Sequence, residues 1–186
     1  MKNIKPYIII SILTISSFGC GNNQKEDKNI QENQKVIQNE TTLEKLETEA
    51  SKLRGGGSVK SVELQNGKAV ISYVKNFEEY KKINPQSGLT EKDLDAYWDG
   101  EDAVEKAIID GAVKIMAKLD FVNEVKIVLP HKDKTYSVDV SKAELEKFTG
   151  SDFDKLKDNL GHDFSDLFVY DHKGREEFLK KFGKIE

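Results

Sequence analysis

The 186-residue sequence contains a single cysteine, Cys20, so it cannot form an intramolecular disulfide. It also lacks an apolar run long enough to span a bilayer as a helix, which needs about 20 residues. The most apolar run, residues 7–18, is twelve residues long. A domain of about 130 residues buries enough surface to fold without disulfides or metal, and the length suits one such domain with a tether.

An excess of positive charge is lacking as well. The chain has 29 Lys and Arg residues against 33 Asp and Glu, which gives a formal net charge of −4. Binding to nucleic acid depends on clustered basic residues that contact phosphates. We therefore expect no nucleic-acid partner and no strong electrostatic hold on anionic lipid.

Motifs of common catalytic sites are missing. The sequence has no Gly-x-Ser-x-Gly nucleophile elbow, no phosphate loop and no dinucleotide fingerprint. The histidines His131, His162 and His172 include no pair at the i, i+4 spacing that places two metal ligands on one helix face. We expect no catalytic residue, no metal and no cofactor, although convergence of His162, Asp163 and His172 would favour an enzyme or a metal site.

An acidic stretch around residues 91–105 raises the possibility of a calcium loop. An EF-hand loop starting at Asp95 places Asp99 and Gly100 correctly, but it puts Tyr97 and Lys106 where ligands are needed. The alternative is that these acidic residues complement the dipole of the helix that follows. This second interpretation is the better one.

The N-terminus has the parts of an export signal. Lys2 and Lys5 precede the apolar run 7–18, a small residue, Gly19, follows it, and the chain turns polar directly after Cys20. A charged segment, a short apolar segment and a small residue at the cleavage point are typical of secretory signal peptides.

This arrangement resembles bacterial lipoprotein precursors, with Ser17, Phe18, Gly19 and Cys20 at the lipobox. The resemblance covers about the first 25 residues. It implies a signal peptide over 1–19, a thioether-linked diacylglyceryl group on Cys20, and a membrane-anchored lipoprotein on the extracytoplasmic side of the cell envelope. Cleavage before Cys20 leaves 167 residues with 27 basic and 33 acidic side chains, a formal charge of −6.

Residues 20–57 are expected to connect the lipid to the domain. Residues 21–39 are almost entirely polar, which predicts a disordered tether spanning about 25 Å as a coil and about 65 Å when extended. Residues 42–54 follow a helical pattern of apolar positions, with Thr41 and Glu44 as a capping box. We expect a short amphipathic helix that packs loosely on the domain as a stalk, joined to it by a flexible Gly55–Gly57 segment.

Residues 58–186 are expected to form one globular domain. An Asn-Gly pair at 66–67 between two alternating segments predicts a β-hairpin. Residues 102–119 carry an uninterrupted apolar face of a long helix, in which Gly111 allows close approach of another layer. The other expected elements are a helix over 90–98, strands over 125–129 and 136–140, and helices over 141–149, 152–159 and 174–182. The fold class is α+β: a small antiparallel sheet of two hairpins packed against one long amphipathic helix, with short C-terminal helices.

An acidic and aromatic segment precedes the long helix and is the candidate partner-binding surface. It contains Tyr97, Trp98, Asp99 and Glu101. Trp and Tyr are favoured anchors of protein interfaces, and a turn at a helix start usually lies at the surface. At least one of the two rings is therefore expected to be partly exposed, whereas a Trp98 that plugs the end of the core would remove this surface.

The leading functional hypothesis is a binding or interaction module of the envelope, with a protein or small-molecule partner. The alternatives are an inhibitor or immunity-type lipoprotein that blocks an enzyme or uptake apparatus, and an envelope hydrolase. An exposed Trp98 flanked by carboxylates favours the inhibitor. A deep apolar pocket beneath the long helix favours a small ligand.

Overall fold

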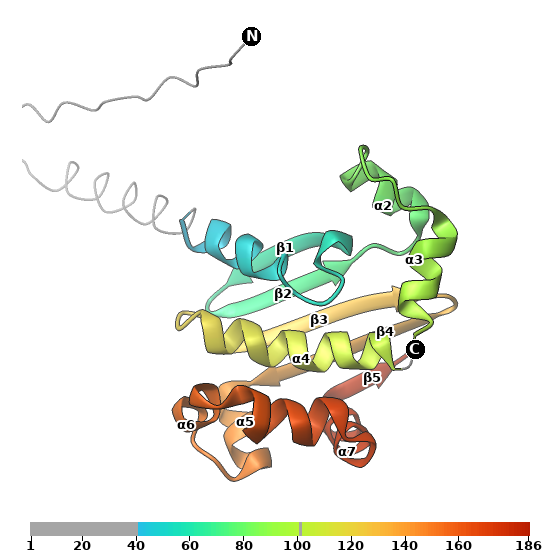
Figure 1. The fold of residues 1–186 in the computed structure, drawn as a ribbon. Coiled ribbons are helices and arrows are strands. Elements are labelled where there is room, and N and C mark those ends of the chain that lie inside the picture. The colour runs from blue at the N-terminus through green and yellow to red at the C-terminus, as the bar shows by residue number, and fades with distance from the viewer. Residues whose placement is uncertain (1–40, 101) are drawn as a thin grey trace, which may run out of the picture. The chain divides into compact units, whose positions relative to one another are not determined.

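The computed structural model describes residues 41–100 and 102–186. Cys20, the apolar run before it, the polar residues 21–39 and Glu101 lie outside the described residues, so the signal, the lipid and the tether stay predictions. The α+β fold class is confirmed, because a five-stranded sheet packs against a layer of helices (Figure 1). Within the described ranges, no helix combines the length and the apolarity needed to cross a bilayer.

The sheet is mixed and has the strand order β1-β2-β3-β4-β5. Its strands are β1 (Val59–Gln65), β2 (Lys68–Tyr73), β3 (Glu124–His131), β4 (Lys134–Ser141) and β5 (Gly183–Ile185). Neighbouring strands are antiparallel except β2 and β3, which are parallel. The prediction of a purely antiparallel sheet is therefore wrong. The two predicted hairpins are present, but the long helical connection from β2 returns the chain to the end of the sheet where β2 began, so that β3 runs parallel to it.

The two hairpin turns use residues with positive φ. Asn66 and Gly67 have φ values of 52° and 78°, as the Asn-Gly pair predicts for a type I′ turn. The second hairpin turns at Lys132 and Asp133, with a φ of 54° at Lys132. Its strands are longer than the pattern 125–129 and 136–140 suggested, because Pro130 and His131 still pair with β4.

The helical layer contains more elements than the sequence pattern predicted. Residues 41–50 are helical, and they are followed by η1 (Gly56–Ser58), α2 (Phe77–Ile83), α3 (Glu91–Trp98), α4 (Ala103–Lys118), α5 (Lys142–Thr149), α6 (Phe153–Asp158), the π-helical segment η2 (Gly161–Tyr170) and α7 (His172–Phe182). Helix α3 begins with a capping box between Thr90 and Asp93, and α5 with one between Ser141 and Glu144.

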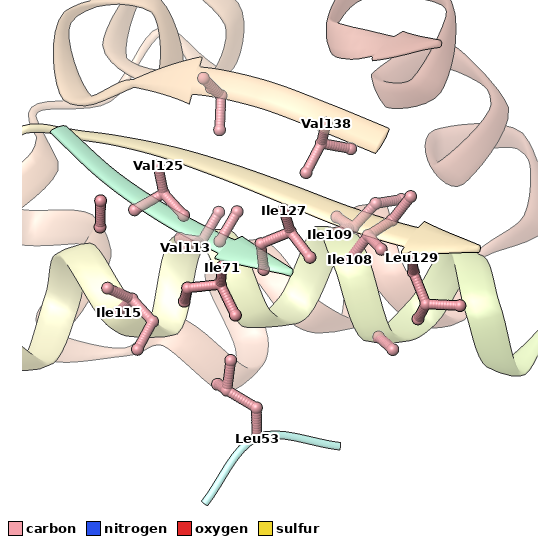
Figure 2. Packing of buried hydrophobic residues seen from close by; sticks show 14 of the residues in the cluster. Leu53, Ile71, Ile108, Ile109, Val113, Ile115, Val125, Ile127, Leu129 and Val138 are labelled. Atoms are coloured by element: carbon pink, nitrogen blue, oxygen red, sulfur yellow. The ribbon is translucent and has the colours of Figure 1, made fainter. Parts of the chain in front are cut away.

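The core lies between α4 and the sheet. Val125, Ile127 and Leu129 alternate along β3 and point from the sheet towards α4 (Figure 2). Gly111 allows the predicted close approach, since a Cβ atom there would lie 2.9 Å from Ile127 Cδ1 and 3.3 Å from Leu53 Cδ1. The central helix is thus pressed against both the sheet and the segment before β1.

Helix α4 is buried on more than the one face that its pattern predicted. Ile109 and Val113 lie outside the predicted stripe, yet both are fully buried. Helix α7 and the π-helical segment η2 pack against α4 and cover this second side. The sequence pattern therefore predicted the face of α4 that packs on the sheet. It did not predict the second buried side, which packs against α7 and η2.

The N-terminal helix is part of the core and not a loosely packed stalk. Leu46 and Ala50 are fully buried, and Leu53 is nearly so. Residues 41–57 belong to the same compact unit as the remaining described residues, so the domain does not begin at Ser58 as expected. The narrow apolar stripe of this helix packs against the core, and the opposite side of the helix carries polar residues exposed to solvent.

The glycine segment 55–57 forms a packed turn where a flexible joint was expected. Gly55 has a φ of 67°, and a Cβ atom there would lie 2.4 Å from Trp98 Cη2. A Cβ atom on Gly56 would lie 2.2 Å from the carbonyl oxygen of Ser51. Both glycines are therefore required by close contacts, whereas Gly57 faces open space.

Candidate functional site

The aromatic pair of the predicted partner surface divides between core and surface. Trp98 is only 7% exposed and makes edge-on ring contacts with Tyr73 and Tyr97, at centroid distances of 5.6 Å and 4.8 Å. Tyr97 is 45% exposed. The expectation that one ring is exposed is met by Tyr97, but Trp98 plugs the end of the core and cannot present a binding surface.

Asp99 of the same segment is held by the turn between β3 and β4. Its carboxylate lies 2.8 Å from His131 Nε2 and 2.6 Å from Lys132 Nζ. The Lys132 ammonium first, and the His131 ring second, hold the pKa of Asp99 below its usual value. The fourth predicted residue, Glu101, lies outside the described residues. Of the candidate surface, Tyr97 and Asp99 remain exposed.

A polar pocket of about 290 Å³ lies beside Asp99, at the N-terminal end of α4. Asp102 and Glu105 line it from the helix, while His131 and Lys132 line it from the hairpin turn. Each of these acidic groups already has a cationic partner within the protein. The pocket therefore offers a ligand few unsatisfied charges.

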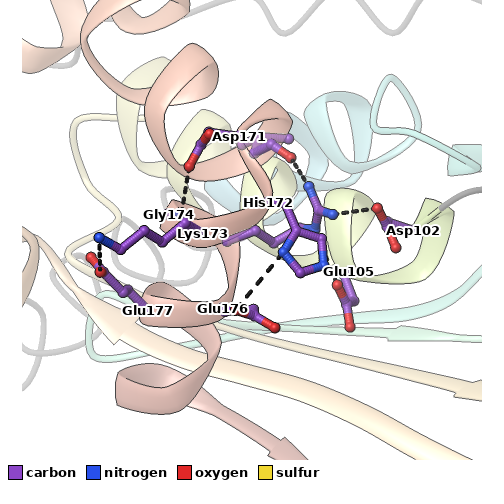
Figure 3. A network of polar contacts seen from close by, with 10 residues as sticks. Asp102, Glu105, Asp171, His172, Lys173, Gly174, Glu176 and Glu177 are labelled. Atoms are coloured by element: carbon purple, nitrogen blue, oxygen red, sulfur yellow. Dashed lines mark hydrogen bonds and ion pairs between the residues drawn. The ribbon is translucent and has the colours of Figure 1, made fainter.

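The partner of Asp102 and Glu105 is Arg175 of α7, whose side chain is only 3% exposed. Figure 3 shows Asp102 and Glu105 facing the helix that carries His172 and Gly174. The Nε of Arg175 donates to Glu105 Oε2 at 3.1 Å, its Nη1 donates to the carbonyl oxygen of Val169 at 2.8 Å, and its Nη2 donates to Asp102 Oδ2. The side chain of Asp102 makes no capping hydrogen bond to α4. The prediction that the acidic residues here serve the helix dipole is thus incomplete, because two of them fix α7 to the start of α4.

The histidines of the C-terminal region do not assemble a catalytic or metal-binding group. His162 Nδ1 lies 3.0 Å from its neighbour Asp163, and His172 Nδ1 lies 3.8 Å from Glu176. Both histidine side chains are strongly exposed. Over residues 41–100 and 102–186, no three His, Cys, Asp or Glu residues are placed to hold a metal ion.

A larger pocket of about 510 Å³ lies at the opposite end of α4. Three separate segments enclose it: residues 49–53, the C-terminal half of α4, and η2. Leu53, Ile115, Leu160 and Tyr170 form its apolar wall. Leu53 and Ile115 are buried, and Tyr170 is exposed at the rim.

The π-helical geometry of η2 aligns one wall of this pocket. The amide of Asp171 donates to the carbonyl oxygen of Asp166 at 3.2 Å, an i, i+5 hydrogen bond. Residues spaced by four or five positions therefore share a face, and the pocket is lined by Gly161, Ser165, Asp166 and Tyr170. A Cβ atom on Gly161 would have no neighbour within 4 Å, so this glycine leaves space open.

Three lysines surround the pocket, and they differ in their partners. Lys52 pairs with Glu49 at 2.6 Å, and Lys114 pairs at 2.7 Å with Asp110. Asp110 is buried and also accepts a 3.3 Å hydrogen bond from Ser165 Oγ. Lys118 lines the pocket as well, and it has no ion-pair partner in the part of the chain that the structure describes.

Sequence reasoning did not find this pocket. The only signal was the i, i+4 spacing of Lys114 and Lys118, which is common on solvated helix faces. Two of its walls, residues 49–53 and η2, are more than a hundred residues apart in the sequence. In addition, η2 is π-helical and does not follow the 3.6-residue period by which α-helices are predicted.

Comparison with known proteins gives no relative. No protein-family model matches the chain, and no curated protein or solved structure is significantly similar to it.

Proposed function

We propose that the protein is an envelope lipoprotein, anchored through lipid on Cys20, whose α+β domain binds a small and largely apolar ligand and has no chemistry of its own. The observation that carries the binding part is the pocket between residues 49–53, α4 and η2. Its volume of about 510 Å³ lies in the range of small-molecule sites, roughly 300–1,000 Å³. Its lining surface is mainly apolar, as is usual for such sites, and the charged residues around it are Glu49, Lys52, Lys114, Lys118 and Asp166.

The small-ligand function is better supported than the inhibitor function. An inhibitor was expected to expose Trp98 among carboxylates, but Trp98 is buried and Asp99 is paired with Lys132 and His131. A pocket at the long helix was expected for a small ligand. The pocket lies beside the C-terminal half of α4 and not beneath it, because the sheet fills the space under the helix.

Tyr97 supports a second candidate function, binding of a protein partner at the other end of α4. Its ring is 45% exposed and rests on the buried Trp98, so it is presented rigidly beside Asp99. Rigid tyrosines are common interface anchors. A hydrolase has less support, because His162 and His172 contact different acidic residues.

The charged and apolar segments before Cys20 support the lipid anchor. The polar stretch 21–39 follows Cys20 directly, and as a coil of about 25 Å it would hold the domain clear of the lipid headgroups. Metabolic labelling with a fatty-acid probe should mark the wild type and not Cys20→Ala, and the variant should leave the membrane fraction or remain uncleaved. Equal labelling of the two proteins would contradict the anchor.

Pocket binding is tested with the full chain carrying Cys20→Ala, which has no acyl group of its own. Decanol, a neutral aliphatic probe, should bind saturably in calorimetric titration. Gly161→Leu places a side chain in the open space of the pocket and should weaken binding about tenfold, a change of about 1.4 kcal/mol. Gly88→Leu is the matched control, because Gly88 is also exposed and faces open space. The proposed ligand binding would be overturned if decanol binding did not saturate, or if Gly161→Leu and Gly88→Leu weakened decanol binding equally.

A further inference from the structure

We infer that the ligand of this pocket is an amphiphile with one aliphatic chain and a negatively charged head, which Lys118 binds. The inference rests on the proposed function and adds the charge and the form of the ligand. A free fatty acid and a single-chain phosphate ester share this chemistry.

The positive charges lie on two of the three segments that enclose the pocket. Lys114 and Lys118 are one turn apart on α4, and Lys52 belongs to the segment that carries Leu53. Lysine side chains pack their methylene groups on apolar surface and keep the ammonium group in water. The three lysines therefore extend the apolar wall outward and place cationic groups at its solvent edge.

The lysines are not equally available to a ligand. The ammonium groups of Lys52 and Lys114 are already paired with Glu49 and Asp110. Lys118 is exposed and, among the described residues, has no such partner. An anionic head at Lys118 would gain a charge-assisted hydrogen bond while its chain lies against Leu53 and Ile115.

The opposite wall carries a negative charge that orients the ligand. Asp166 of η2 lines the pocket and is exposed. It repels an anionic head, so the head is directed to the α4 side and the chain passes between Leu160 and Ile115. Asp166 would attract the cationic part of a zwitterionic head, and the experiment below therefore includes a zwitterionic probe.

Lys118 also has a structural interpretation that must be separated from ligand binding. It is in the last turn of α4, where a cation stabilises the negative end of the helix dipole. That role predicts a lower stability for Lys118→Gln and no change in ligand preference. Ligand binding predicts the reverse: a changed preference at nearly constant stability.

The test compares four decyl probes on the full chain with Cys20→Ala: decanoate, decanol, decyltrimethylammonium and the zwitterionic decylphosphocholine. All are used below the concentrations at which they form micelles. Decanoate should bind about tenfold tighter than decanol, and decyltrimethylammonium should bind more weakly than decanol. Lys118→Gln should remove the preference for decanoate, so that decanoate and decanol bind the variant with similar affinity. Lys155→Gln, at an exposed lysine of α6 away from the pocket, should keep the preference.

The outcomes separate this inference from the proposed function. Saturable decanol binding that Gly161→Leu weakens, without any preference for decanoate, overturns the anionic head and leaves the ligand-binding function standing. Tighter binding of decylphosphocholine than of decanoate also overturns the anionic head, because it indicates a zwitterionic ligand. Absence of saturable binding by every probe overturns both.

Discussion

The two ends of α4 carry similar numbers of charged side chains but use them differently. At the N-terminal end, Asp102 and Glu105 are bound by Arg175, and Asp99 is bound by His131 and Lys132. The pocket there has a volume of about 290 Å³ and polar walls. At the C-terminal end the pocket is about 510 Å³ with a mainly apolar wall.

The difference shows how charge pairing separates a structural joint from a binding site. Arg175 donates through all three of its nitrogens, to Asp102 and Glu105 at the start of α4 and to Val169 of η2, so the N-terminal end fixes α7 in place. At the C-terminal end, one hydrogen bond from Ser165 to Asp110 links η2 to α4, and Lys118 faces solvent. Variants at the two ends should therefore affect stability at the first and ligand binding at the second.

The largest expected effect is at Arg175. Arg175→Ala should lower the free energy of unfolding by about 3–5 kcal/mol, because it removes a side chain that is 3% exposed together with its three hydrogen bonds to Asp102, Glu105 and Val169. Chemical denaturation of the two proteins measures this loss. Lys173→Ala, at an exposed lysine two positions away, is the control and should change little. Equal small effects of both substitutions would show that Arg175 is not a structural tie.

The N-terminal helix offers the next largest effect. Leu46→Ala should cost about 2–5 kcal/mol, since it leaves a cavity at a fully buried position. Glu47→Ala changes an exposed neighbour in the same helix and should be close to neutral. Denaturation midpoints that do not differ between these variants would support the loosely packed stalk and contradict the structure.

A smaller effect is expected at the glycine turn. Gly55→Ala should destabilise the protein by about 1–3 kcal/mol, because φ is positive there and the new methyl group meets the Trp98 ring. Gly57→Ala is the matched control, with open space around the added Cβ atom. Thermal unfolding followed by Trp98 fluorescence should show a lower midpoint for the first variant alone.

The smallest effect concerns pH. Lys132 and His131 lower the pKa of Asp99, so its contribution to stability is present above its usual pKa. This contribution should be lost as pH falls below about 4, through the lowered pKa. The stability difference between the wild type and Asp99→Asn should be small at pH 7 and should shrink in acid. A difference that stays constant from pH 7 to pH 3 would contradict this pairing.

Much of the fold could be predicted from local chemistry. The Asn66-Gly67 turn, the helices predicted over 90–98 and 141–149 and the long helix depend on residues close together in sequence, and all are present. Helix α2 was missed, although Asn76 caps it by accepting from the amide of Glu79 at 3.0 Å, because its seven residues are too few to show a period. Strand β5 was missed because three residues paired to β4 show no alternation.

The site was less predictable than the fold, because contacts distant in sequence define it. Tyr97 and Trp98 are adjacent in one helix, and contacts with residues distant in sequence, Gly55 and Tyr73, bury the Trp98 ring. Likewise, nothing in the sequence around Lys118 indicates that η2 lies opposite it. The parallel pairing of β2 and β3 could not be predicted for the same reason, because it depends on the path of the whole chain segment that connects them.

The most direct test of the contrast between the two ends of α4 is amide shift mapping by NMR with decanoate. The probe is added to ¹⁵N-labelled full chain carrying Cys20→Ala. Saturable shifts are expected at Leu53, Ile115 and Ser165, and the indole N–H signal of Trp98 should not change. Shifts concentrated at Trp98 and His131, which line the pocket at the N-terminal end of α4, or no saturable shift at Leu53 and Ile115, would contradict the binding site at the C-terminal end.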